Sequence, residues 1–135
     1  IMKKLLLILL CLPMIFSSCK EEEEESPFVG EWSGTYSGTF TENASLEDSI
    51  NANGDFNGTF SLSNLDEYIA NFPAFGTVTN NGTANFSGVR GVANMTYTVN
   101  FNGEFNESIG SGTWSSISDS LAVIVESGTW QVNKQ

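Results

Sequence analysis

The chain has 135 residues and an acidic balance, with 5 Lys and Arg, 16 Asp and Glu, no His, and a formal net charge of −11. This length allows one domain with a substantial core but not two, and the lack of basic clusters excludes nucleic acid as an expected partner. The absence of His removes serine–histidine and cysteine–histidine nucleophiles and most zinc sites.

The first eighteen residues have the pattern of a secretory signal peptide. Lys3 and Lys4 form a short basic region, and an apolar run follows from Leu5 to Phe16. A membrane-spanning helix needs about 20 apolar residues, so this run is too short to cross a bilayer. We therefore expect residues 1–18 to be a signal peptide, cleaved after Ser18.

The cysteine after this segment lies in a distinctive context. Ser17 and Ser18 stand immediately before Cys19, which resembles the lipobox of bacterial lipoproteins, although Phe16 replaces the usual leucine. The resemblance implies that the Cys19 thiol receives a diacylglyceryl group and that the new amino terminus is acylated. Each buried methylene contributes about 0.8 kcal/mol, so several chains on one residue give a stable membrane anchor. The alternative is a free or disulfide-bonded cysteine.

An acidic run comes directly after Cys19. Lys20 is followed by five glutamates, beginning with Glu21 and Glu22. This order resembles the lipoprotein export signal of Bacteroidetes, which implies an outer-membrane protein facing the cell exterior. A plain solvated tether is the alternative, because adjacent like charges repel and resist burial, and both interpretations can hold together. We expect residues 19–27 to be the acylated cysteine with an acidic tether.

Residues 28–135 form the predicted folded domain, and they alternate with period two. From Phe28 to Phe40 the even positions are aromatic or glycine, and the segments Gly54–Leu62 and Ala93–Phe105 repeat this pattern. Since successive strand side chains point to opposite faces, each segment predicts a strand with an aromatic and glycine inner face. A glycine beside an aromatic residue leaves space for a ring from the neighbouring strand. The expected strands are 28–41, 44–51, 54–62, 74–79, 83–89, 92–105, 109–116 and 121–133.

The connections between these strands carry turn signals. Candidate turns are Asn53-Gly54, Asn81-Gly82, Arg90-Gly91 and Asn102-Gly103, the last being either a turn or a bulge within a strand. The segment SNLDEYIANF predicts one helical turn before Pro73. Leu121–Val125 is apolar at every position, which predicts that it is covered on both faces, with the Leu65–Phe72 segment as the candidate cover.

These elements predict an all-β fold. Eight antiparallel strands with one apolar face either close on themselves or leave unpaired edges that are prone to aggregation. We therefore expect an eight-stranded meander closed into an up-and-down β-barrel, with a two-sheet β-sandwich as the alternative. The opening VGEW, through Gly30 and Trp32, resembles the start of the calycin barrels, the lipocalin and avidin relatives. The resemblance implies architecture only.

Two classes of function suit such a barrel. In the first, a binding module, the open end accepts a small apolar ligand or a sugar ring stacked on aromatic residues; the candidates are Trp32, Tyr36, Tyr97 and Trp114. Against this, eight-stranded barrels can be filled by their own side chains, and these rings can be core alone. In the second, a structural or protein-interaction component of the cell envelope, the outer face rich in Ser and Thr holds a partner.

Neither catalysis nor a metal is expected. Glycoside hydrolysis needs two carboxylates, but the spacing of Glu31, Asp55 and Glu104 singles out no pair. The segment NANGDFNGT has oxygen-bearing residues at alternate positions, as calcium loops do, yet it lacks the closing glutamate of an EF-hand. An Asn-Gly hairpin turn explains the same residues. We therefore expect a non-enzyme without cofactors, whose membrane contact is the lipid anchor.

Two tripeptides match the Bacteroidetes O-glycosylation pattern of aspartate, a hydroxyl residue and an aliphatic residue. They are Asp48-Ser49-Ile50 and Asp119-Ser120-Leu121. The match implies Ser49 and Ser120 as modification sites, although chance alone could supply one such tripeptide.

Overall fold

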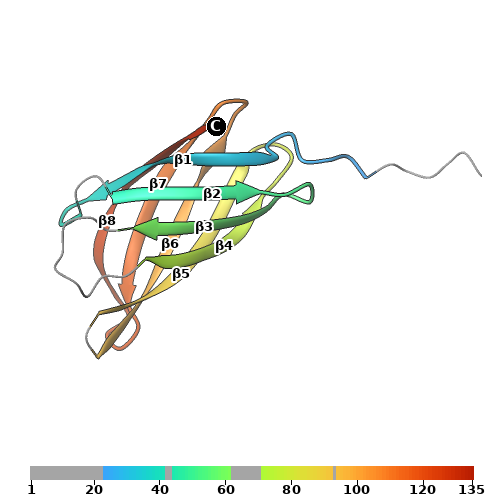
Figure 1. The fold of residues 1–135 in the computed structure, drawn as a ribbon. Coiled ribbons are helices and arrows are strands. Elements are labelled where there is room, and N and C mark those ends of the chain that lie inside the picture. Colours follow the sequence, from blue (N-terminus) through green and yellow to red (C-terminus); the bar gives the residue numbers. More distant parts are fainter. Residues whose placement is uncertain (1–22, 42–43, 62–70, 93) are drawn as a thin grey trace, which may run out of the picture.

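A computed structural model describes residues 23–41, 44–61, 71–92 and 94–135. Eight antiparallel strands follow one another around a closed barrel (Figure 1). This architecture confirms the predicted up-and-down β-barrel and rejects the sandwich. The signal peptide and Cys19 to Glu22 lie outside the described residues. The strands are β1 Gly30–Gly38, β2 Ala44–Ile50, β3 Asp55–Ser61, β4 Phe72–Val78, β5 Thr83–Val92, β6 Met95–Phe105, β7 Ile109–Ser118 and β8 Val123–Lys134.

The barrel closes because the last strand returns to the first. Each strand pairs with the next one in the chain, and β1 also pairs with β8, placing Gly34 opposite Val132 and Tyr36 opposite Trp130. Closure satisfies the backbone groups that edge strands would expose. Among the described residues, no helix has the length and apolarity needed to cross a bilayer.

Two of the four predicted turns are confirmed and two are wrong. Gly54 and Gly82 lie in turns with φ of 81° and 95°, where a side chain would be strained. Arg90-Gly91 instead lies inside β5, and Asn102-Gly103 lies inside β6 without a bulge, because both pairs continue regular ladders with the neighbouring strands. Cross-strand pairing thus overrides the local turn preference. The predicted helical turn falls mainly on residues 62–70, outside the described residues.

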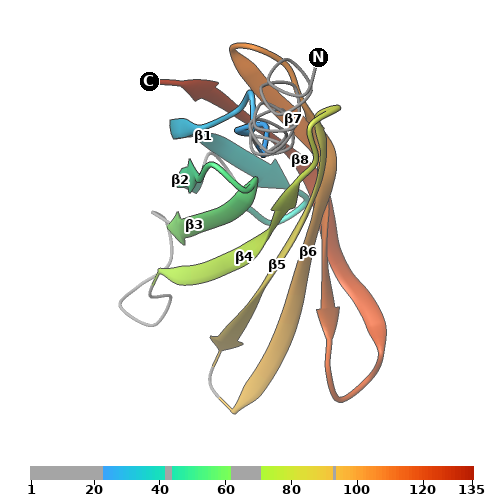
Figure 2. The same ribbon diagram turned by 90° about the vertical axis from the view of Figure 1, so that its right-hand side faces the viewer.

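The prediction that Leu121–Val125 is covered on both faces is also wrong. Leu121 is 67% exposed and Ile124 is 66% exposed. The physical reason is that the β7–β8 hairpin projects beyond the rest of the wall (Figure 2), so these side chains lie past the sheet that could cover them. Residues 65–70 of the proposed cover lie outside the described residues.

A column of aromatic rings fills the barrel. Phe56 stacks on Phe86 with centroids 3.9 Å apart, and Phe101 stacks on Phe60 at 4.2 Å and on Phe86 at 5.0 Å. Ring pairs of this kind contribute about 0.5–1.5 kcal/mol beyond the area that they bury. The core therefore consists of side chains from the inner faces of all eight strands.

The inner-face glycines make room for these rings and for the curvature of the wall. A Cβ on Gly38 would lie 2.6 Å from Cζ2 of Trp114, and one on Gly103 would lie 2.6 Å from Cζ2 of Trp130. At Gly34 and Gly128 a Cβ would instead collide with the carbonyl oxygen of the adjacent strand. The alternation of glycine with aromatic residues thus produces a narrow barrel with a ring-filled interior.

Candidate functional site at the distal end of the barrel

The two ends of the barrel are built differently. In a meander, alternate connections lie at opposite ends, so the β2–β3, β4–β5 and β6–β7 turns share one end with the chain segment before β1 (Figure 1). We call this end the plugged end, because Phe28 packs there. The Trp32 Nε1–H donates to the Phe28 carbonyl at 3.0 Å, and the Phe28 ring centroid lies 6.1 Å from that of Phe105. We call the opposite end, where β1–β2, β5–β6 and β7–β8 connect, the distal end.

Polar side chains replace aromatic ones on the inner face near the distal end. Register places Ser116 opposite Val99 and Glu126, and the next row brings together Arg90, Tyr97 and Ser118. Cross-strand partners share a face, so these side chains face the interior together with the Tyr36 hydroxyl. We define the polar cup as Tyr36, Arg90, Tyr97, Ser116, Ser118 and Glu126.

Among the described residues, three atoms of the polar cup are buried and have no hydrogen-bond partner. They are the Tyr36 hydroxyl, Arg90 Nε and the Ser116 hydroxyl. Tyr36 is 2% exposed and Ser116 is fully buried. Buried polar groups are normally paired, because leaving one unsatisfied costs about 1–3 kcal/mol. This concentration of unsatisfied groups makes the distal end of the barrel the candidate functional site.

The charged groups of the cup act on the Tyr36 hydroxyl. Burial raises the pKa of Tyr36 well above its usual value, the Arg90 guanidinium opposes that rise, and Glu126 adds to it. Tyr36 therefore stays protonated and is available as a hydrogen-bond donor. Glu126 is itself held by the Phe40 backbone N–H, which donates to its Oε1 at 2.8 Å.

Exposed apolar side chains lie near the polar cup at the distal end. The β5–β6 and β7–β8 hairpins extend past the other strands at this end (Figure 2) and carry most of them. Register places Met95 and Val123 on the inner side of the mouth, while Val89 and Ile124 face outward. We define the apolar rim as Phe40, Val89, Met95, Leu121, Val123, Ile124 and Val125. The distal end thus presents a polar interior inside an apolar border.

The four aromatic residues expected to contact a ligand do not form one site, although Tyr36 and Trp114 pack together. Trp32 and Trp114 are 1% and 3% exposed, and each indole N–H donates to a backbone carbonyl, that of Phe28 and that of Ser37 respectively. Tyr36 packs edge-on against Phe60 and Trp114 and turns its hydroxyl toward the cup. Tyr97 is half-buried, with the Arg90 guanidinium 5.6 Å from its ring centroid. Only the two tyrosines belong to the cup.

A buried carboxyl lies deeper in the barrel. Asp48 of β2 points inward between Leu46 and Ile50 and is 4% exposed, and neither of its carboxyl oxygens has a hydrogen-bond partner among the residues that the structure describes. Burial raises the pKa of Asp48 to about 8, with a smaller contribution from the charge of Glu31. The group is therefore protonated at neutral pH. Within the described residues, no cluster of three His, Cys, Asp or Glu side chains could hold a metal ion.

The segment weighed as a calcium loop folds as the Asn-Gly turn. The Asn51 side-chain oxygen accepts hydrogen bonds from the backbone N–H groups of Asn53 and Asp55, at 2.9 and 3.0 Å, and Gly54 N–H donates to the Asn51 carbonyl. The oxygen that would face a cation is thus used by the turn itself.

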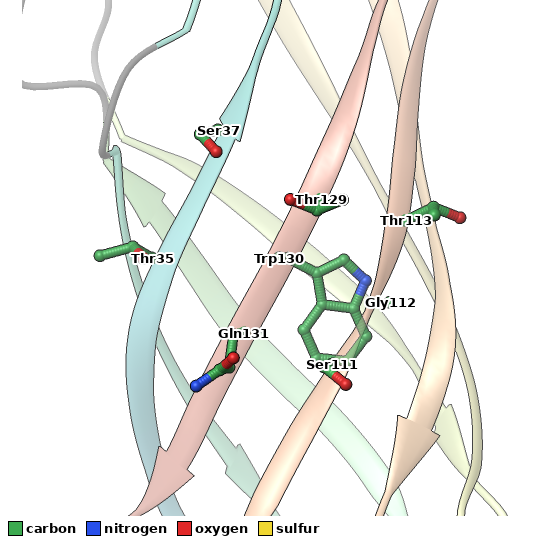
Figure 3. Close-up of a pocket in the computed structure, with 8 residues that line it drawn as sticks. All are labelled: Thr35, Ser37, Ser111, Gly112, Thr113, Thr129, Trp130 and Gln131. Carbon is green, nitrogen blue, oxygen red and sulfur yellow. The ribbon is translucent and has the colours of Figure 1, made fainter.

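The outer face bears a shallow hydroxyl groove. It crosses β1, β8 and β7, has a volume of about 410 Å³, and is bordered by side chains of Thr35, Ser37, Ser111, Thr113, Thr129 and Gln131 (Figure 3). Ser37 lies opposite Thr129, which in turn lies opposite Thr113, so the hydroxyls form rows across the strands. This groove is the Ser- and Thr-rich surface that the sequence indicated.

The two candidate O-glycosylation sites differ in accessibility. Ser49 lies within β2, with the side chains of Asp48 and Ile50 both buried. Ser120 lies in the exposed β7–β8 turn, and its neighbours Asp119 and Leu121 are exposed as well. An enzyme could reach all three residues only at Ser120 in the folded chain.

Sequence reasoning missed most of the polar cup. The parity of β7 and β8 would have placed Ser116, Ser118 and Glu126 inside, because they continue the faces that contain Trp114 and Trp130. Arg90 was missed because the Arg-Gly pair was interpreted as a turn. No family model, no curated protein and no solved structure matches this chain significantly.

Proposed function

We propose that the protein is a lipid-anchored envelope protein whose barrel acts as a non-catalytic binding module at its distal end. The observation that carries this proposal is the set of three buried polar atoms, on Tyr36, Arg90 and Ser116, for which the described part of the chain provides no hydrogen-bond partner. A ligand that offers matching donors and acceptors would remove a cost of about 1–3 kcal/mol for each group.

The ligand that suits this end is a small apolar molecule with one polar group. Its polar group would contact the Tyr36 and Ser116 hydroxyls and the Arg90 guanidinium, and its apolar part would lie against Met95 and Val123 at the mouth. Small-molecule sites commonly combine apolar walls with a few polar groups that fix orientation. A sugar ring stacked on Tyr97 is the other ligand class that these side chains would accept.

The proposed anchor would determine which end of the barrel faces the membrane. Ser26 lies seven positions after Cys19, and its backbone N–H donates to the Ala52 carbonyl at the plugged end. Seven residues span at most about 25 Å. An acylated Cys19 would therefore keep the plugged end toward the membrane and leave the distal end facing away from it. The lipobox resemblance and the acidic run after it support the proposal of an outer-membrane lipoprotein exposed at the cell surface.

Native mass spectrometry of the full protein purified from its own envelope tests the binding proposal. We expect a small-molecule adduct on the wild type that is lost in Arg90→Gln and reduced in Ser116→Ala. Lys134→Gln, which removes a cation at the plugged end, is the matched control and should keep the adduct. The mass of the released molecule separates an apolar ligand from a sugar. A wild type that carries no adduct, and whose binding of fatty acids and oligosaccharides does not depend on Arg90, contradicts the proposal.

The anchor is tested independently. Mass spectrometry of the N-terminal peptide should show acyl chains on Cys19, and protease treatment of intact cells should degrade the wild type. Replacing Glu21 to Glu25 with alanine should protect the protein from that protease by leaving it on the inner leaflet. Unmodified Cys19 would reject the anchor, and unchanged surface exposure of the alanine variant would reject the export signal.

A structural or protein-interaction role in the envelope is the second candidate, favoured by the hydroxyl groove on β1, β8 and β7. Purification from detergent-solubilised envelope distinguishes it, because a stoichiometric protein partner lost on Thr129→Lys would support this role. Recovery of the protein alone would favour the binding module.

A further inference from the structure

We propose a second binding site on the outer wall of the barrel, centred on Phe75, that takes a neutral oligosaccharide. Phe75 lies on β4 and is 58% exposed, although its neighbours on the same strand, Ala74 and Val78, are buried. Its ring lies on the outer surface, whereas the residues of the polar cup point into the interior. This proposal does not depend on a ligand at the distal end.

The residues beside Phe75 are polar and uncharged. Register places Asn57 of β3 and Ser87 of β5 directly opposite Phe75, and Ser87 lies opposite Asn100 of β6. These strands lie side by side on one wall (Figure 1). Because cross-strand partners share a face, the ring stands on the outer surface in a row of amide and hydroxyl groups.

Two hollows flank the exposed ring, and Phe75 borders both. One, of about 440 Å³, is lined by Ser49, Asn51, Asp55 and Asn57; the other, of about 370 Å³, is lined by Asn85, Ser87, Asn100 and Asn102. An aromatic ring with a hollow on either side can be contacted on its face while polar groups reach the edges of the bound molecule. Ile109, another exposed apolar residue on the outer wall, borders neither of these hollows.

The chemistry of this surface favours a neutral sugar over other partners. A sugar ring has an apolar face of C–H groups that can stack on an aromatic ring, and amides both donate and accept hydrogen bonds, as the hydroxyls of a sugar do. The polar residues that line the two hollows include no cation, and their one charged group is Asp55. Together with a net charge of −11, this disfavours acidic glycans and phosphorylated ligands. A peptide strand is also disfavoured, because the closed barrel presents no free sheet edge.

Affinity electrophoresis of the full protein tests this site. The protein, in a detergent without a sugar headgroup, migrates through native gels cast with neutral polysaccharides, such as mannan, xylan and β-1,3-glucan, or with polygalacturonate. We expect at least one neutral polysaccharide to retard the wild type and polygalacturonate not to do so. Phe75→Ala should weaken binding about tenfold or more through loss of the stacking surface, and Phe75→Trp should preserve it.

Matched variants serve as controls for the electrophoresis experiment. Ile109→Ala removes an exposed apolar side chain elsewhere on the outer wall and should leave retardation unchanged. Circular dichroism should show the same fold for all variants, and Phe75→Ala should retain any adduct at the distal end. Retardation by polygalacturonate alone, unchanged binding in Phe75→Ala, or mobility unaffected by every neutral polysaccharide would each overturn the proposal. Arg90→Gln should abolish the distal adduct without affecting retardation, so the two sites can fail separately.

Discussion

The plugged end and the distal end of this barrel use the same strands for opposite purposes. At the plugged end Trp32 packs on Phe105 with centroids 4.9 Å apart, and its indole N–H is satisfied by the Phe28 carbonyl. At the distal end Tyr36 and Ser116 are equally buried, yet no described residue forms a hydrogen bond with their hydroxyls. One end maximises stability, whereas the other tolerates unpaired polar groups.

This contrast indicates which end of the barrel is expected to bind a ligand. Local choices of residue normally agree with the fold, and departures that lower stability concentrate at functional sites. Four sets of substitutions, taken in order of decreasing effect on stability, test whether the two ends divide stability and binding in this way.

The largest effect is expected from Trp32→Ala at the plugged end. This substitution removes a ring that is 1% exposed and leaves a cavity beside Phe105, so the free energy of unfolding should fall by about 3–5 kcal/mol. Phe40→Ala in the apolar rim is the control and should change it by less than about 0.5 kcal/mol, because Phe40 is 77% exposed. Urea denaturation measures both. Similar losses at the two positions would contradict the contrast.

A pH-dependent effect is expected from Asp48 between the two ends. Its pKa is near 3.8 in an unfolded chain and about 8 in the folded barrel, so between these values the folded state keeps a proton that the unfolded state has released. The stabilisation that comes from this proton is fully present below about pH 4. Above that pH the free energy of unfolding falls by about 1.4 kcal/mol per pH unit until the pH passes 8.

Asp48→Asn should therefore remove this loss and be more stable than the wild type at pH 8, by about 2 kcal/mol or more, with little difference at pH 4. Thermal unfolding across this pH range provides the measurement. Glu47→Gln, on the exposed face of the same strand, controls for the change in net charge and should not flatten the profile. Parallel profiles for Asp48→Asn and wild type would show that Asp48 titrates normally.

A smaller change in the free energy of unfolding, of opposite sign at the two ends, is expected when a serine is replaced by alanine. Ser116→Ala removes an unpartnered buried hydroxyl, so stability should stay unchanged or rise by up to about 1 kcal/mol. Ser26→Ala at the plugged end removes the hydroxyl that accepts from the Phe28 N–H at 3.3 Å, and stability should fall by about 0.5–1 kcal/mol. Chemical denaturation of both variants checks the signs. A clear loss for Ser116→Ala would indicate a structural hydroxyl.

The smallest effect is expected within the apolar rim. Val123→Ala should change the free energy of unfolding by less than about 0.5 kcal/mol, because the side chain is half exposed. The same substitution at the fully buried Val132 should cost about 1.5–3 kcal/mol. Denaturant titration compares the two, and ligand affinity should fall only for Val123→Ala. An equal loss of stability would show that the rim is part of the core.

Much of the fold could be predicted because alternation is a local signal. The period-two pattern from Phe28 onward fixes which side chains share a face, and the expected strands match the observed ones within a few residues. Turn predictions were wrong where pairing between strands competes with the local turn preference, as at Arg90-Gly91. The Leu121–Val125 prediction failed because no local pattern reveals that a hairpin extends past its neighbours.

The candidate site was less predictable for the same reason. Parity identifies Asp48, Ser116 and Glu126 as inward-facing, but it does not indicate that the hydroxyl of Ser116 has no partner while Glu126 binds the Phe40 N–H. Partner atoms come from strands distant in sequence, and only closure determines their distances. For this reason only the structure could assign Trp32 and Trp114 to the core, and Tyr36 and Tyr97 to the polar cup.

The inner and outer faces of the strands, and the number of strands, follow from the amino-acid sequence alone, because side-chain alternation and turn chemistry act over a few residues. Two other properties depend on how the strands come together. Phe28 packs at one end, while the other end has buried hydroxyls without a partner among the described residues, and Phe75 is exposed beside polar side chains on the outer wall. These properties arise from register between strands around a closed wall, where a shift of one residue would exchange every inner side chain for an outer one.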